Sequence, residues 1–377
     1  MYIQREVYRS GVGMTFNQTH EVDLPEQGEL LAAMLYMSST QNASALVDVK
    51  KWRLIDYISK IELIGDGAEP IKSLSGTQAL AAAFYNTGQV PSSQWRNYSS
   101  VPHRQLIPLH MGRHLNDLRH RLAMNRFGQV KLRITNDATA TQLTTSISLT
   151  LVLYWLREAQ GLPNQGYYRE EQWKTWTNVA AAIEYSNLPT KLPIRRIMLE
   201  AIPGKTAAFK CEATMNGLLN DIEMTLRSGQ SRVYKGSHDV LTRIVHEELG
   251  FIPVVQIENY NTGGNAFETG IGYVTGAIGA PGTYAAVAAY VDTYLQDDVN
   301  DSAQFCNDRV ADAPINVVVR GHSFCHHTPL WWSKEPDDSD LLDVEAVKDV
   351  AVDITTQSGI TVTNTPKTSI ILSRLVR

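Results

Sequence analysis

The amino-acid sequence predicts an all-β protein built from two similar halves, with one helix in each half. Two observations lead to this prediction. Short landmarks of the first half recur in the same order in the second half, which indicates a duplicated domain. Most periodic segments alternate apolar and polar residues, and a period of two is typical of strands with one buried face.

The repeat is carried by short segments in a constant order. Leu24-Pro25 precedes the apolar run 30–35, and Leu188-Pro189 precedes the run 194–199, 164 positions later. The further pairs are Ile61-Glu62-Leu63 with Ile222-Glu223-Met224, Pro108-Leu109 with Pro329-Leu330, and residues 130–135 with residues 350–355. A single match of this kind would carry no weight, but the shared order predicts two copies of one domain.

Several segments have the alternation of strands. Val130, Leu132 and Ile134 alternate with polar residues, and Ile222 and Met224 do the same in the second half. Residues 147–155 begin with alternation and end continuously apolar, which predicts burial on both faces at the end of that strand. Residues 315–319 and 369–372 are further β-rich runs.

Each half contains one segment with the start and stop signals of a helix. Ser75 can cap the free amides of a first turn, and Gly88 permits the left-handed residue that ends many helices. Pro91 then prevents continuation. The corresponding signals in the second half are Ser237, Gly250 and Pro253. A third helix is expected over residues 113–127, where Leu115, Leu118 and Leu122 would share one face.

The spacing of the repeat shows where the copies differ. The offset between copies is 161 to 164 residues as far as Pro91 and Pro253, and 220 to 221 from Pro108 and Pro329 onward. The second copy therefore carries about 59 extra residues in one place, as surface loops tolerate. We expect an N-terminal domain at 1–165 and a C-terminal domain at 166–377, with a large surface insertion at about 254–328.

The stretch 157–178 is expected to link the copies, because Gly161, Pro163 and Gly166 interrupt regular structure there. Trp173 and Trp176 are expected to pack between the domains, and stacking on a sugar is the alternative role for them.

Composition excludes several classes of protein. Apolar residues make up 43% and charged residues 19%, as in a folded protein, and the net charge is −5 without a basic run. Direct nucleic-acid binding is not expected, because such affinity comes from neutralising phosphates. No apolar stretch has the length of a membrane-spanning helix, and residues 1–6 lack the apolar core of a signal peptide. Cys211, Cys306 and Cys325 have neither metal-ligand nor disulfide spacing, so synthesis in a reducing cytoplasm is expected.

The densest group of candidate metal ligands is His322-Ser-Phe-Cys325-His326-His327. Imidazole and thiolate could bind zinc, but no second ligand cluster accompanies them, so a strand end is the favoured interpretation. His246-Glu247-Glu248 lacks the second histidine of a zinc-protease helix and is interpreted as a solvated helix face.

Glycines and acidic residues form the other candidates. Gly270-Ile-Gly272-Tyr-Val-Thr-Gly276 has the wrong spacing for a nucleotide-binding loop and is interpreted as an irregular, turn-rich loop. The acidic groups are Asp297-Asp298 with Asp301, and Asp337-Asp338 with Asp340. They could serve a glycosidase or bind calcium, but solvated turns are the favoured interpretation. No catalytic, cofactor-binding or metal-ligating residue is assigned from the sequence.

The repeated pattern resembles a known family. In the first half the matching residues are Leu106-Ile-Pro-Leu109 and Val130-Lys-Leu-Arg-Ile, and in the second half they are Thr328-Pro-Leu-Trp-Trp332 and Val350-Ala-Val-Asp-Ile. The gap from Pro-Leu to the next strand is 22 and 21 residues, respectively. With one capped helix per half, this is similar to the double jelly-roll major capsid proteins of tailless icosahedral viruses, the lineage of adenovirus hexon and membrane-containing bacterial viruses.

The resemblance implies two tandem eight-stranded jelly-roll barrels in each chain. Six similar barrels in a homotrimer would form a pseudo-hexagonal capsomer, with the insertion as a tower on the outer surface. The implied partners are other copies of the chain, neighbouring capsomers, and penton and minor capsid proteins, with no cofactor and no enzymatic activity. The implied location is the virion, after synthesis in the host cytoplasm. Residues 1–15 show no clear amphipathic helix, so contact with an internal lipid membrane stays open.

Two alternatives belong to other classes of protein. A two-barrel carbohydrate-binding or carbohydrate-active protein is suggested by Trp331-Trp332, Trp173, Trp176 and the acidic loops. A double cupin is disfavoured, because neither half has the His-x-His with the downstream ligands of that family.

Overall fold

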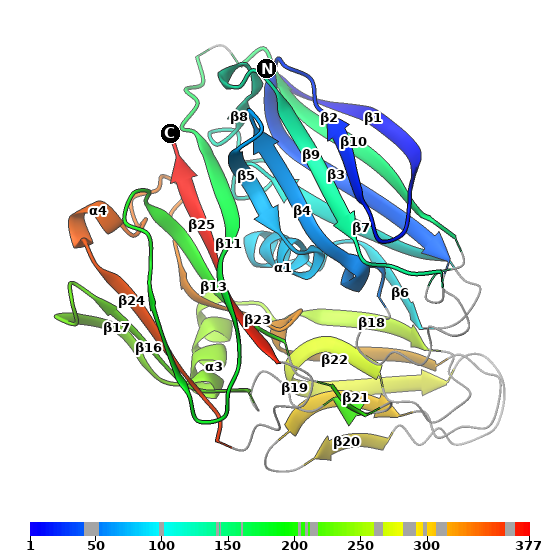
Figure 1. Cartoon of the computed structure of the whole chain (residues 1–377), viewed down its shortest axis with the longest axis vertical. Coiled ribbons are helices and arrows are strands. Elements are labelled where there is room, and N and C mark those ends of the chain that lie inside the picture. Colours follow the sequence, from blue (N-terminus) through cyan, green and yellow to red (C-terminus); the bar gives the residue numbers. More distant parts are fainter. Residues whose placement is uncertain are drawn as a thin grey trace.

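The computed structural model describes the chain apart from residues 41–52, 98–101, 141–142, 144, 160, 203–204, 208–209, 212–217, 260–266, 282–291, 297–299, 307–314 and 359–365. The described part is almost entirely β-structure arranged as two barrels (Figure 1). None of its helices is both long and apolar enough to cross a membrane.

The N-terminal barrel consists of two antiparallel four-stranded sheets. The first has the order β1–β10–β3–β7 and the second β2–β9–β4–β5. The strands are β1 (Tyr2–Met14), β2 (Thr19–Asp23), β3 (Glu29–Thr40), β4 (Ile58–Gly65), β5 (Glu69–Leu74), β7 (Pro102–His110), β9 (Val130–Asn136) and β10 (Ile147–Arg157). The shorter elements are β6 (Ser93–Asn97), β8 (Leu122–Ala123) and the 3₁₀ turns η2 (Leu54–Tyr57) and η3 (Met124–Arg126).

The C-terminal barrel repeats this arrangement strand for strand. Its sheets have the orders β11–β25–β13–β23 and β12–β24–β16–β17. The strands are β11 (Tyr167–Thr177), β12 (Ile183–Asn187), β13 (Ile194–Ile202), β16 (Leu219–Leu226), β17 (Ser231–Ser237), β23 (His327–Trp332), β24 (Val350–Thr356) and β25 (Lys367–Val376). Short elements are β14 (Lys205–Ala207), β15 (Lys210–Cys211) and helix α4 (Val344–Val347). Two eight-stranded jelly rolls in tandem confirm the predicted fold class.

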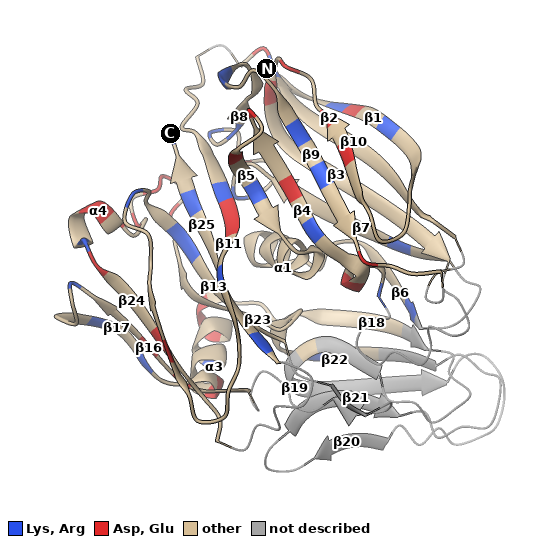
Figure 2. Cartoon of the chain, in the orientation of Figure 1, with Lys and Arg blue, Asp and Glu red and all other residues tan. Residues whose placement is uncertain are grey.

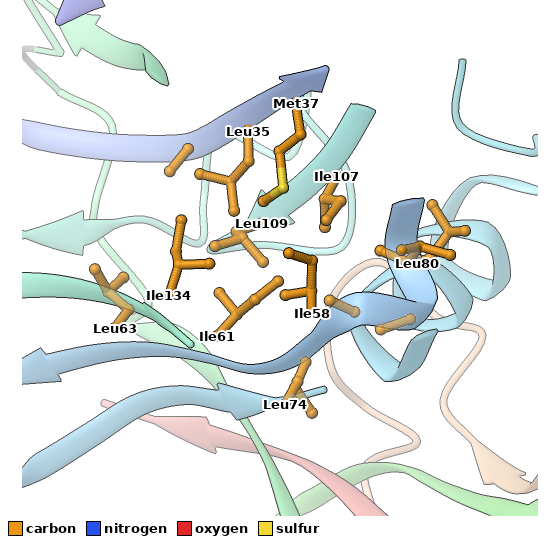
Figure 3. Close-up of a cluster of buried hydrophobic side chains, with 14 of the residues drawn as sticks. Leu35, Met37, Ile58, Ile61, Leu63, Leu74, Leu80, Ile107, Leu109 and Ile134 are labelled. Carbon is orange, nitrogen blue, oxygen red and sulfur yellow. The ribbon is translucent and has the colours of Figure 1, made fainter. Parts of the chain in front are cut away.

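The residues that alternate as apolar in the sequence form the barrel cores. Strands β9 and β24 bury every second residue. In the N-terminal barrel, Leu35 and Ile107 of one sheet face Ile61 and Ile134 of the other, and all four side chains are fully buried (Figure 3). Burying an aliphatic side chain of this size contributes about 1.5–3 kcal/mol, so the two faces drive the sheets together.

One capped helix of 12 residues is inserted in each barrel, as the sequence predicts. Helix α1 (Gly76–Thr87) begins after Ser75, whose hydroxyl accepts the Gln78 amide, and ends at Gly88 with φ 71°. Helix α3 (His238–Leu249) begins after Ser237 and ends at Gly250 with φ 72°. Helix α1 lies near the centre of the molecule, where the barrels meet (Figure 1).

The expected helix over residues 113–127 is wrong. The segment consists of turns, strand β8 and the 3₁₀ turn η3. The Asp117 carboxylate accepts the backbone amide of Arg113 and also contacts the ring of His120. Side-chain bonds of this kind compete with helical hydrogen bonds, which the leucine periodicity could not reveal.

The expected linker 157–178 is too long, because most of it forms strand β11. Strand β11 pairs with β25 of its own barrel and, through Glu170 and Glu171, runs parallel to β5 of the other barrel. Trp176 packs against the core of the C-terminal barrel, whereas Trp173 is 42% exposed, so the expectation that both lie between the domains is also wrong.

The segment 254–328 adds strands rather than an irregular loop. They are β18 (Val254–Asn259), β19 (Phe267–Pro281), β20 (Asp292–Gln296), β21 (Asn300–Cys306) and β22 (Ile315–Phe324). The glycine-rich stretch 270–276 lies inside β19, which pairs with β22, so its interpretation as a turn-rich loop is wrong. Val255, Ile257, Val319 and Phe324 are buried in the core of the N-terminal barrel. The segment is therefore more than a surface addition.

Candidate functional site: the junction between the barrels

The two barrels meet through buried charged residues. Figure 2 shows basic and acidic positions on β5, β11, β13 and β25 in the middle of the molecule. Lys72 on β5 lies 2.8 Å from Glu170 on β11, and Arg196 on β13 lies 2.9 Å from the other oxygen of the same carboxylate. All three side chains are at most 6% exposed.

The environment of Glu170 keeps it ionised. Burial disfavours the carboxylate, but Lys72 and Arg196 outweigh this effect and lower the pKa of Glu170 to about 2. Lys72 also donates to the backbone carbonyl of Tyr168, and Arg196 donates to the carbonyl of Ala82 and to Asn86 on helix α1. A buried ion pair gives little net stability, but it strongly disfavours any arrangement that leaves one charge unpaired. This cluster therefore fixes how the barrels dock.

A second cluster surrounds Asp338, in the loop after β23. Its carboxylate accepts from Arg113 at 2.7 Å, from His120 Nε2 at 2.7 Å and from the hydroxyl of Tyr168. Burial acts against the charge, but these three hydrogen bonds lower the pKa of Asp338 well below its usual range. Arg113 and His120 belong to the N-terminal barrel, so this cluster also joins the two barrels.

His120 is held between two carboxylates. Its Nδ1 lies 2.9 Å from Asp117, and its Nε2 lies 2.7 Å from Asp338. Ionised carboxylates only accept hydrogen bonds, so both ring nitrogens must donate and the ring carries a positive charge. Burial opposes this charge, but hydrogen bonds to Asp117 and Asp338 raise the pKa of His120.

A third set of contacts joins helix α1 to β13 and β11. Gln78 donates to Glu200 at 2.7 Å and to Gln172 at 2.6 Å. Beside it, the Tyr85 hydroxyl donates to the carbonyl of His327 and accepts from the amide of Phe324. The ring of Phe324 lies 4.7 Å from the ring of Phe84, so the helix of one barrel also packs against the segment before β23. These contacts fix the helix to both barrels.

The histidine-rich group forms a tight hairpin. Cys325 and His326 have φ of 50° and 60° between paired Phe324 and His327, the geometry of a two-residue turn with left-handed central residues. Burial lowers the pKa of His326 to about 3, so its ring is neutral. Within the described residues, no group of three or more His, Cys, Asp or Glu is placed to hold a metal ion. The strand-end interpretation agrees with this geometry.

The acidic groups have different outcomes. Asp297, Asp298 and the side chain of Asp301 lie outside the described residues. The interpretation of the other group as a solvated turn is wrong for Asp338, whose side chain is 4% exposed. Asp340 accepts from the nearby Lys334 and Glu335 amides, as an aspartate in a turn does. The cluster of aspartates is visible in the sequence, but the basic partners of Asp338, Arg113 and His120, lie more than 200 positions away.

Trp331 and Trp332 do not form an exposed sugar-stacking platform. Trp331 and Trp332 are partly buried against the core of the C-terminal barrel, and Lys334 lies over the ring of Trp332. Their aromatic surface is used for packing, so the carbohydrate-binding alternative is not favoured. His246 donates from Nδ1 to the backbone carbonyl of Phe251, while Glu247 and Glu248 are exposed, as expected for a helix face.

Solved structures share this architecture over the whole chain. The structure of the STIV major capsid protein has a TM-score of 0.61 and 10% identity, covering 100% of this chain and 97% of that one. The atomic structure of Sulfolobus Turreted Icosahedral Virus gives 0.60 and 12%, covering 99% and 90%. The quasi-atomic model of the PBCV-1 virus capsid gives 0.52 and 11%, covering 99% and 93%. These are double jelly-roll major capsid proteins, and this chain has their fold.

Sequence comparison adds nothing to this likeness. No family model matches the chain, and no curated protein matches it.

Proposed function

We propose that this chain is the major capsid protein of an icosahedral virus and that three copies form a pseudo-hexagonal capsomer. The observation that carries the proposal is the duplication: both halves have the same eight-strand pairing and the same capped helix. The likeness to the capsid structures extends over both barrels at a TM-score of 0.61. In a trimer, two similar barrels per chain supply six similar units around a threefold axis.

The rigid junction suits this role. A capsomer keeps its pseudo-sixfold shape only if the two barrels of each chain hold a fixed orientation. The buried clusters around Glu170 and Asp338 provide that orientation, because a rotation of one barrel would leave buried charges unpaired. We place the barrel boundary at 165/166, between β10 and β11.

The proposed role is structural and not enzymatic, and the proposed location is the virion after synthesis in the host cytoplasm. The partners would be other copies of the chain within the capsomer, neighbouring capsomers, and penton and minor capsid proteins. A bacterial virus is the proposed source, and an internal lipid membrane is a further candidate partner. The shared architecture of the capsid structures supports the capsid role and the contact with other copies of the chain.

The decisive experiment is the solution mass of the purified protein, measured by light scattering on a sizing column. One chain is 42.0 kDa, so a trimer would be about 126 kDa. A trimer that survives dilution, and that forms hexagonal arrays when concentrated and imaged, is the expected result. A monomer at every concentration would contradict the proposal.

A further inference from the structure

The two barrels differ at one set of equivalent positions on their outer surfaces. In the N-terminal barrel, Arg133 on β9 lies between Glu21 on β2 and Glu62 on β4, its register partners. Its Nε is 2.7 Å from the Glu21 carboxylate. The basic residue is therefore flanked by two acidic ones, which is a favourable cross-strand arrangement.

In the C-terminal barrel the equivalent positions carry Tyr185 on β12, Asp353 on β24 and Glu223 on β16. Asp353 and Glu223 are direct register partners, and like charges opposite each other are destabilising. Arg232 and Lys235 pair with Glu223, but Asp353 has no ion-pair partner within the part of the chain that the structure describes. Burial and the neighbouring Glu223 raise the pKa of Asp353.

Apolar side chains accompany these carboxylates. Ile183 is 50% exposed and Tyr185 is 66% exposed, although both lie on a regular strand. With Glu223, its ion-pair partner Lys235 and Asp353, they line a pocket of about 360 Å³. We call this surface of β12, β24 and β16 the acidic–apolar face. Strand β12 is the edge of its sheet among the described strands, and a free edge beside exposed apolar residues is typical of a contact surface.

A complementary surface lies on β1, at the edge of the N-terminal barrel. Arg5, Val7 and Arg9 are exposed there, with Val7 at 63%. Arg5 and Arg9 lie over the rings of Tyr154 and Tyr8, and neither has an acidic partner in the described ranges of the chain. We call these three residues the β1 strip.

The two surfaces lie at opposite ends of the molecule. Strand β1 is at the right of Figure 1, and the sheet with β16, β17 and β24 is at the left. Figure 2 shows the basic positions along β1. The two halves of the sequence differ in net charge in the same direction. Residues 1–165 carry 16 basic and 13 acidic residues, whereas residues 166–377 carry 18 basic and 26 acidic residues.

We propose that the acidic–apolar face binds the β1 strip of a second copy of this chain, head to tail. A contact between two acidic–apolar faces would place the unpaired Asp353 carboxylates of the two copies together, which disfavours a symmetric contact and favours a heterologous one. A heterologous contact that closes forms a ring. The inference rests on the proposed capsomer and names the surfaces that meet in it. The arginines would meet Asp353 and Glu223, and Val7 would pack near Ile183 and Tyr185.

The test reverses the charge of Asp353. The N-terminal barrel already has an arginine, Arg133, at the equivalent position. Asp353→Arg introduces the residue type of Arg133 beside Glu223, so the melting temperature of the isolated chain should stay the same or rise. Self-association, measured by light scattering over a dilution series, should require at least tenfold more protein. Asp353→Arg with Tyr185→Glu reproduces the whole N-terminal arrangement and is the second variant. Glu247→Arg, an exposed change of equal charge on α3, is the control and should assemble as wild type.

A charge swap tests the partner surface. Arg5→Glu with Arg9→Glu should weaken association by a similar factor, and combining these changes with Asp353→Arg should restore it. Wild-type trimers together with unaltered assembly of the Asp353→Arg variant, or no recovery in the combined variant, would overturn the inference while leaving the capsomer proposal intact. A wild-type monomer at all concentrations would overturn both.

Discussion

The Nε2 atom of His120, in the N-terminal barrel, lies 2.7 Å from Oδ2 of Asp338, in the C-terminal barrel. The opposite ring nitrogen faces Asp117 at 2.9 Å. The histidine is therefore a buried cation that joins the two barrels, and its charge depends on pH.

The first prediction is a pH-dependent contribution of His120 to stability. Its pKa in the folded chain is raised above the usual 6.5, so the folded state holds the proton more tightly than the unfolded state. The stabilisation is complete below pH 6.5 and is lost as pH rises through the raised pKa. We expect the difference in unfolding free energy between wild type and His120→Gln to shrink by about 1–3 kcal/mol between pH 6 and pH 9.

Comparison with the variant is needed because other histidines act in the opposite sense. Burial lowers the pKa of His238 to about 3 and of His110 to about 4. The unfolded chain therefore takes up these protons first, and the folded protein becomes less stable as pH falls below 6.5. Urea unfolding of both proteins across the pH range separates the effects. A constant difference at all pH values would show that His120 is not charged in the junction.

The second prediction concerns Asp338 itself. Asp338→Ala leaves Arg113 and His120 buried without their shared acceptor, and removing one partner of a buried ion pair costs about 3–5 kcal/mol. The measurement is denaturant unfolding. The control is Glu335→Ala, an exposed residue of the same loop, for which a change within about 0.5 kcal/mol is expected. Equal effects of the two substitutions would contradict a role for Asp338 in the junction.

The third prediction uses the two equivalent helix ends. Gly88 and Gly250 both adopt the left-handed conformation, so alanine at either position should cost about 1–2 kcal/mol. A Cβ at Gly88 would also lie 2.9 Å from the ring of Phe251, whereas a Cβ at Gly250 meets nothing within 4 Å. Gly88→Ala should therefore lower the melting temperature more than Gly250→Ala. The reverse order would argue against the packing of Phe251 on α1.

The fourth prediction is that only part of the segment 254–328 is needed for folding. Pro281 and Ile315 are register partners at the open end of the β19–β22 pair, so residues 282–314 can be replaced by a short Gly/Asn turn. This variant should keep a cooperative thermal transition. Deleting all of 254–328 should prevent folding, because it removes the fully buried Ile257 and Phe324 from the N-terminal core. Calorimetry of both variants tests the division, and a folded full deletion would contradict it.

Much of the fold could be predicted from the sequence because its signals are local. Alternation along β9 and β24 gave the buried faces, and the caps at Ser75 and Gly88 gave the ends of α1. Both depend on residues only a few positions apart. The failure at residues 113–127 has the same origin, since leucine spacing there favoured a helix while Asp117 bonds the backbone instead.

The duplication, the strand periodicity and the two capped helices are therefore encoded in local patterns of the amino-acid sequence. Which charged side chains meet depends on the packing of distant segments, because the partners of Glu170 and Asp338 are 26 to 225 positions away in the sequence. No local pattern distinguishes a solvated Asp from one that is buried between Arg113 and His120. The free energy of a charged side chain depends mainly on whether the folded chain buries it and pairs it, and much less on the residues next to it in the sequence. The docking of the barrels, and with it the candidate site, is for this reason a property of the folded chain.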